Sequence, residues 1–79
     1  MDETVTLYRI DPRRNMRRYY RLSLEPSLFG DIALVREWGR LGRSGQQTIG
    51  LYDGQNAALN ALARLAAAKR RRGYQAATD

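Results

Sequence analysis

The chain has 79 residues and a net charge of +6, and it contains neither Cys nor His. A chain of this length predicts one domain, residues 1–79, whose core is too small to enclose a large active site. The lack of Cys and His excludes disulfides, thiolate metal sites, a Cys nucleophile and the commonest general base. We therefore expect a protein that is not an enzyme and that holds no cofactor or metal.

Four β-strands are predicted, each rich in β-branched, aromatic or alternating apolar residues. They are residues 4–10, residues 17–25, a third segment from Ile32 into the stretch Trp38-Gly39-Arg40, and residues 46–52. Turn residues, including Pro12, separate the first pair, and residues 26–31 are predicted to be a loop. Alternation in the second strand places Tyr20, Leu22 and Leu24 on one face, which we expect to face the core.

A helix is predicted from Gly54 to about Arg72, because this segment is rich in Ala and contains no Pro. Asp53 is the expected N-cap and Gly73 the expected stop. The basic run at residues 69–72 lies where a helix end favours positive charge. Tyr74 is expected to fold back onto the core, and the five residues after it to fray. The apolar stripe of this helix comprises Ala58, Leu59, Leu62, Leu65 and Ala66, and ends at Lys69.

Together these elements predict an α+β fold. We expect an antiparallel sheet of about four strands, with one C-terminal helix packed across one face. The small Ala side chains of the helix would let it lie close to the sheet.

The stretch from Trp38 to Gly45 reads Trp-Gly-Arg-Leu-Gly-Arg-Ser-Gly and holds the only Trp of the chain. Trp offers a flat apolar face, Arg offers donors that match phosphate, and Gly permits sharp turns. This combination is typical of a surface that holds the end of a nucleic acid strand. Two alternatives stand beside it: a single Trp is most often part of the core, and the glycine-rich stretch is also typical of a hairpin loop.

The charge points to a polyanion as partner. Thirteen of the fourteen basic residues are Arg, and Lys69 is the one Lys. The isoelectric point is about 10.5, which in a small domain favours nucleic acid as partner. No apolar run approaches the length of a membrane span, and the start Met1-Asp2-Glu3 is unlike the basic start of a signal peptide. We therefore expect a cytoplasmic protein without membrane contact.

Three motifs, in order, resemble the WGR domain of DNA-dependent poly(ADP-ribose) polymerases and of short bacterial proteins. The resemblance covers residues 15–74, nearly the whole chain. Its motifs here are Asn15-Met16-Arg17-Arg18-Tyr19-Tyr20, then Trp38-Gly39-Arg40-Leu41-Gly42, and then the helix positions Ala58, Leu62, Ala66, Lys69, Gly73 and Tyr74.

The resemblance implies an antiparallel sheet with one helix across a face, and a role at the terminus of a DNA break. It implies that Trp38 is a stacking surface against the terminal sugar, and that Arg40 contacts phosphate or a neighbouring domain. Asn15 is a further candidate contact. Arg18 keeps the charge of the Lys usual in the family, whereas Arg17 replaces a usual Asn.

We hypothesise a module that binds DNA, at ends or nicks, through a basic surface that contains Trp. The candidate residues are Trp38, Asn15, Arg13, Arg14, Arg17, Arg18, Arg40 and Arg43. The alternative hypothesis is a protein-interaction module that docks a partner through the Trp-Gly-Arg hairpin, because Trp and Arg are also typical interface anchors. We expect Arg40, at a strand end, to be largely exposed and to add little to stability.

Overall fold

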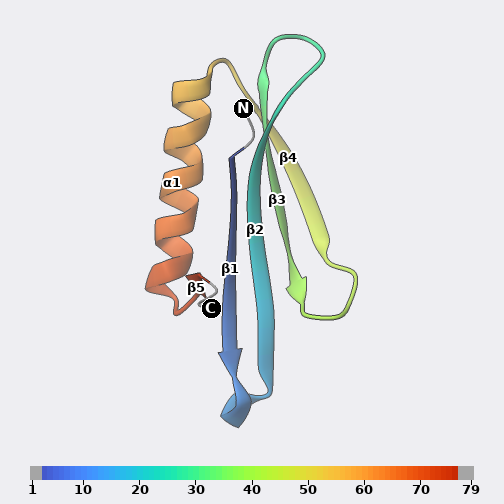
Figure 1. Ribbon diagram of the computed structural model, residues 1–79, viewed down its shortest axis with the longest axis vertical. Helices are drawn as coiled ribbons and strands as arrows, with labels where there is room; N and C mark the ends of the chain where they lie inside the picture. Colours follow the sequence, from blue (N-terminus) through green and yellow to red (C-terminus); the bar gives the residue numbers. More distant parts are fainter. Residues whose placement is uncertain (1–2, 77–79) are drawn as a thin grey trace.

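Five strands form one antiparallel sheet in the computed structural model, which describes residues 3–76 (Figure 1). The strands lie in the order β4-β3-β2-β1-β5, and the helix α1 packs against β1 to β4 from one side. The predicted α+β class and the four predicted strands are confirmed. The elements are β1 (Glu3–Asp11), β2 (Met16–Pro26), β3 (Ile32–Arg40), β4 (Gln46–Tyr52), α1 (Gln55–Arg71) and β5 (Gln75–Ala76).

Side-chain alternation gives the sheet two unlike faces. The face beneath α1, here called the helix-covered face, carries Val5, Leu7, Arg18, Tyr20, Leu22, Leu24, Leu34, Arg36, Trp38 and Arg40. The opposite face, here called the open face, carries Tyr8, Ile10, Arg17, Tyr19, Arg21, Val35, Glu37, Gly39, Ile49 and Leu51. Among residues 3–76, no helix covers the open face.

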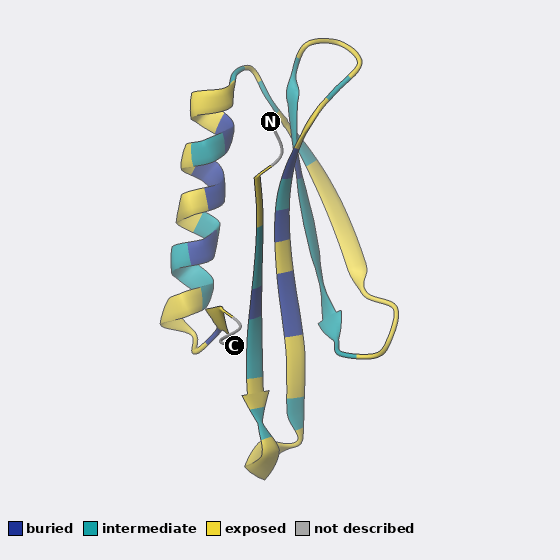
Figure 2. Cartoon of the chain, in the orientation of Figure 1, coloured by how far each residue is buried: buried dark blue, intermediate teal, exposed yellow. Residues whose placement is uncertain are grey.

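The core lies between the helix-covered face and the side of α1 that faces it, as the dark blue positions in Figure 2 show. The expectation that Tyr20, Leu22 and Leu24 face the core is confirmed. Four α1 residues complete it on the helix side: Ala58, Ala61, Leu62 and Ala66. The small size of the three Ala side chains lets α1 approach the sheet closely.

The two ends of α1 are built differently. At the start, the predicted Asp53 cap is wrong, because Gly54 holds the N-cap position in an extended conformation with no side-chain cap bond. At the end, Gly73 has a positive φ of 98°, as a Schellman turn requires. The backbone N–H of Tyr74 then donates to the carbonyl of Lys69 at 3.1 Å. This turn returns Tyr74 to the core, as predicted.

Two further predictions need correction. Residues 75–76 do not fray: they form β5 beside β1, with Leu7 opposite Ala76, because the Schellman turn aims the chain along the β1 edge. The second strand also continues through Pro26, which the sequence assigned to a loop. The expected fraying of residues 77–79 lies outside the described residues.

Candidate functional site

A cleft of about 410 Å³ opens beside Trp38, between the end of β3 and the last turn of α1. We call it the Trp38 cleft. Its walls come from three elements that are distant in sequence, β2, β3 and the C-terminal end of α1. They are Arg18, Trp38, Gly39, Arg40, Lys69 and Tyr74. Three of these residues are cationic and none is acidic, so the lining carries a net positive charge.

Trp38 is half-buried and lies at the edge of the core rather than inside it. The Arg36 guanidinium lies over its ring, 5.9 Å from the centroid, at a cation–π distance. Arg36 is itself held in place, because its Nε donates a hydrogen bond to the Tyr20 hydroxyl at 3.1 Å. Tyr20 is almost fully buried, so the core fixes Arg36, and Arg36 packs on the Trp38 ring.

Lys69 brings a cation from α1 to the same place. Its Nζ lies 4.6 Å from the ring centroid of Tyr20 and 5.2 Å from that of Tyr74. Partial burial, together with the positive charges of Arg72, Arg36 and Arg18, lowers the pKa of Lys69 below its ordinary value. Burial is the larger cause, and the three arginines add to it as like charges close to Lys69.

Arg40 is less exposed than the sequence led us to expect, and it is held in place. One guanidinium nitrogen donates to the backbone carbonyl of Asn15 at 3.0 Å, and another donates to the Asn15 Oδ1 at 3.1 Å. Asn15 can accept both because its backbone is left-handed, with φ of 52°. Arg40 therefore joins the end of β3 to the β1–β2 turn, and it retains further N–H donors for a ligand.

The glycines of the motif bring the β3–β4 hairpin loop back over the open face. A side chain at Gly39 would place its Cβ 2.9 Å from the Gly45 Cα, so the two backbones touch only because both residues are Gly. Gly42, with φ of 82°, supplies the positive φ that the turn needs. The Tyr19 ring lies directly below, 3.5 Å from the Gly39 Cβ position. Gly39 thus supports the loop on one face while Trp38 and Arg40 point to the other.

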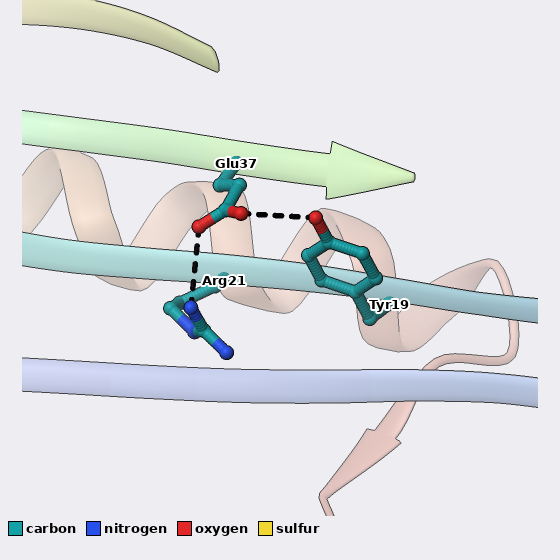
Figure 3. A network of polar contacts seen from close by, with 3 residues as sticks. All are labelled: Tyr19, Arg21 and Glu37. Carbon is teal, nitrogen blue, oxygen red and sulfur yellow. Dashed lines mark hydrogen bonds and ion pairs between the residues drawn. The ribbon is translucent and has the colours of Figure 1, made fainter. Parts of the chain in front are cut away.

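The carboxylate nearest to Trp38 in sequence, that of Glu37, lies on the open face (Figure 3). Its Oε2 accepts a hydrogen bond from the Tyr19 hydroxyl at 3.0 Å, and its Oε1 pairs with Arg21 at 3.2 Å. Burial, and then the bond to Glu37, raise the pKa of Tyr19 above its ordinary value. Glu37 is therefore neutralised away from the cleft and leaves the cleft cations uncompensated.

The structure brings only some of the sequence candidates together. Arg18, Trp38 and Arg40 line one cleft, and Asn15 reaches it through Arg40. Arg17, one residue before Arg18, points to the open face. Arg13 and Arg14 lie in a turn of 3-10 helix at Pro12–Arg14, where Arg14 pairs with Asp11 at 3.7 Å, and Arg43 lies in the exposed hairpin loop.

Sequence reasoning missed two cations of this site. The position of Arg36, two residues before Trp38 in a strand, would have indicated that it shares the face of Trp38. From the sequence, Lys69 was assigned to the helix end and to the family pattern. Its place in the cleft depends on the Schellman turn, which returns Tyr74 to the core beside it.

Comparison with known proteins places these features in a family. A family model described as the WGR domain matches residues 3–79. The chain belongs to the WGR domain family. The WGR domain is a binding module, and in the poly(ADP-ribose) polymerases it binds nucleic acid. This agrees with the resemblance seen in the three sequence motifs.

One relative of this WGR chain comes from Sinorhizobium fredii (strain NBRC 101917 / NGR234) and is named "Uncharacterized protein y4dW". It is 48% identical over 67 residues, which are 85% of this chain and 33% of the relative. The chain thus spans about a third of the length of that relative. No solved structure matches the chain. Within residues 3–76, α1 is neither long nor apolar enough to cross a membrane.

Proposed function

We propose that this WGR domain binds DNA, and that the Trp38 cleft holds the end of a duplex or a nick. The observation that carries the proposal is the group of cations without counterions around the half-buried Trp38 ring. Within residues 3–76, the two ion pairs are Arg14 with Asp11 and Arg21 with Glu37. Neither pair involves a residue of the cleft.

Such a group of cations is unfavourable in the free protein and favourable beside a polyanion. Like charges close to one another disfavour each other's charged forms, and after burial they are the second cause of the lowered pKa of Lys69. A phosphate backbone in the cleft would reverse this repulsion, and it would release counterions from the DNA. The cost to the free protein is therefore recovered on binding.

The arrangement also suits a terminus better than the middle of a duplex. The bases of an intact duplex are stacked on both sides, whereas the terminal residue has a free face on which an aromatic ring can stack. Trp38 provides that ring, and Arg18, Arg40 and Lys69 surround it with phosphate donors. The resemblance to the polymerases implies the same role for Trp38, as a stacking surface at the DNA terminus.

Arg18→Ser tests the proposal, with Arg17→Ser as a matched control. The two residues are neighbours on β2, both are exposed, and each substitution removes one charge, but they point to opposite faces. We expect Arg18→Ser to weaken binding to a blunt duplex clearly more than Arg17→Ser does. Fluorescence anisotropy with a labelled duplex at two salt concentrations measures both.

Equal losses for the two variants would mean that only total charge matters, and would contradict a site at the cleft. No binding of the wild-type protein at low salt would remove the DNA proposal altogether. In that case the protein-interaction alternative would take its place.

A further inference from the structure

A second cleft, of about 470 Å³, lies between α1 and the β3–β4 side of the sheet. We call it the Arg64 cleft. Leu34, Leu65 and Tyr52 give it an apolar and aromatic lining, and Arg36 and Arg64 supply its charges. None of the residues that line it is acidic.

The Arg64 cleft continues the Trp38 cleft along α1. Arg36 connects them, because it lines the Arg64 cleft while its guanidinium lies over the Trp38 ring. On α1, Leu65 lines one cleft and Lys69 the other, one helical turn apart, which is about 6 Å. The two clefts are therefore consecutive along one groove between the helix and the sheet.

The chemistry of the Arg64 cleft fits single-stranded DNA. Proteins bind single strands with cations that follow the backbone and with aromatic or apolar surfaces on which unpaired bases stack. Here Arg36 and Arg64 are the cations, and Tyr52 with Leu65 forms the apolar surface. A duplex stacked on Trp38 has its bases paired and hidden, so only an unpaired extension could place bases in this second cleft.

We infer that the Arg64 cleft binds a single-stranded tail that extends from a DNA end held at Trp38. The inference rests on the proposed function, and it names the substrate class as a duplex end with an overhang. Arg36 then stands at the junction between the paired and unpaired segments.

Gly50 leaves space in this cleft for a bound base. A Cβ at Gly50 would have one neighbour within 4 Å, the Tyr52 Cε1 at 3.6 Å, which is an ordinary contact. Gly50→Glu would therefore put a carboxylate into the cleft without a backbone clash. Leu51→Glu is a matched control, because it adds the same charge to the same strand on the open face, at an exposed residue opposite Ala33.

The experiment compares a blunt duplex with duplexes that carry a tail of about six nucleotides, at either the 5′ or the 3′ strand. Competition titrations give the affinity of each for the wild-type protein. We expect a tail of at least one polarity to increase affinity roughly fivefold or more, the gain expected from stacking one base. Gly50→Glu should abolish this gain and leave blunt-end affinity close to that of Leu51→Glu.

Arg64→Ser provides a second test that does not depend on whether the Gly50→Glu variant folds. Arg64 is exposed on α1, and Arg70→Ser removes the same charge from an exposed residue that lines neither cleft. We expect Arg64→Ser, and not Arg70→Ser, to reduce the gain from the tail.

The outcomes separate the two proposals. Blunt duplexes bound with no gain from either tail would overturn this inference and leave the proposed function intact. A gain that both Gly50→Glu and Arg64→Ser preserve would place the tail elsewhere and also overturn it. No binding of any duplex would overturn both.

Discussion

The Arg40 guanidinium holds Asn15 by two hydrogen bonds, one to its backbone carbonyl at 3.0 Å and one to its Oδ1 at 3.1 Å. The residues are 25 positions apart and belong to the first and second motifs of the WGR resemblance. The pair fixes the β1–β2 turn against the end of β3, next to the Trp38 cleft. Arg40 thus has a structural role beside any contact with DNA.

Arg40→Ala should therefore destabilise the protein, contrary to the expectation from sequence. The loss should be about 1 kcal/mol, because both bonds are solvent-exposed. Asn15→Gly keeps the left-handed backbone and removes only the side-chain acceptor, so its loss should be smaller. Thermal melts of the two variants and their double mutant measure the coupling through the Asn15 side chain, and fully additive losses would show that the bond to Oδ1 contributes nothing.

Leu62→Ala should unfold the protein more easily without changing the DNA affinity of the folded form. Leu62 is 7% exposed in the core, and its truncation leaves a cavity under α1 that costs about 2–5 kcal/mol. Leu28→Ala is the control, because Leu28 is 97% exposed. Denaturant titrations compare the two. A loss below about 1 kcal/mol for Leu62→Ala would contradict the observed packing.

Gly45→Ala should destabilise the hairpin loop by about 1–3 kcal/mol through overpacking. Its added Cβ would collide with the Tyr19 hydroxyl and the Trp38 carbonyl oxygen. Gly50→Ala, in the same hairpin, should be neutral or gain about 0.5 kcal/mol, since Gly is unfavourable in a strand where Ala fits. The melting temperatures of Gly45→Ala and Gly50→Ala measure the two effects. Equal effects would mean that the close approach of the loop to Tyr19 is not present in solution.

As the pH is raised, DNA affinity should begin to fall at a lower pH than it would if Lys69 had the pKa of an ordinary lysine. Burial and the neighbouring arginines lower the pKa of Lys69 in the free protein, and a bound phosphate would stabilise its charged form. DNA affinity is then highest below the pKa that Lys69 has in the free protein, and it declines as the pH rises through that pKa. Lys69→Arg stays charged and should remove this decline.

Affinity is a better measure here than stability. The lowered pKa of Lys69 makes stability increase as its charge is lost at high pH, whereas the raised pKa of Tyr19 makes stability decrease as Tyr19 ionises. The two contributions oppose each other in melts. Titrations of a labelled duplex at constant ionic strength, from about pH 8 to 10.5, isolate the effect of Lys69. An equal decline in both proteins would assign it to another group.

The elements that sequence predicted well were those with local signals. The alternation around Tyr20, the Ala-rich helix and the stop at Gly73 each depend on near neighbours in the chain, and all three were confirmed. The α+β class followed from them. The short strand β5 has no such signal, because two residues pair with β1 only after the Schellman turn directs them there.

The candidate site was harder to predict because it depends on faces and on distant contacts. Arg17 and Arg18 look equivalent in sequence, yet the β2 alternation separates them onto opposite faces. Lys69 joins Trp38 only because α1 crosses the sheet at that level. The fixed position of Arg40 depends on the left-handed backbone conformation of Asn15, which was not predicted from the sequence.

The most direct test of the account is the emission of Trp38, the one Trp of the chain. The protein is titrated with a blunt linear duplex and with a covalently closed circle of the same sequence, at two salt concentrations. We expect the linear ends to quench and shift the emission and the circle to do so much less. If about 3–5 phosphates are neutralised, log K should fall with log salt with a slope of about −3 to −4.5. Equal quenching by the circle, or an emission that neither DNA changes, would contradict a Trp38 cleft that holds DNA ends.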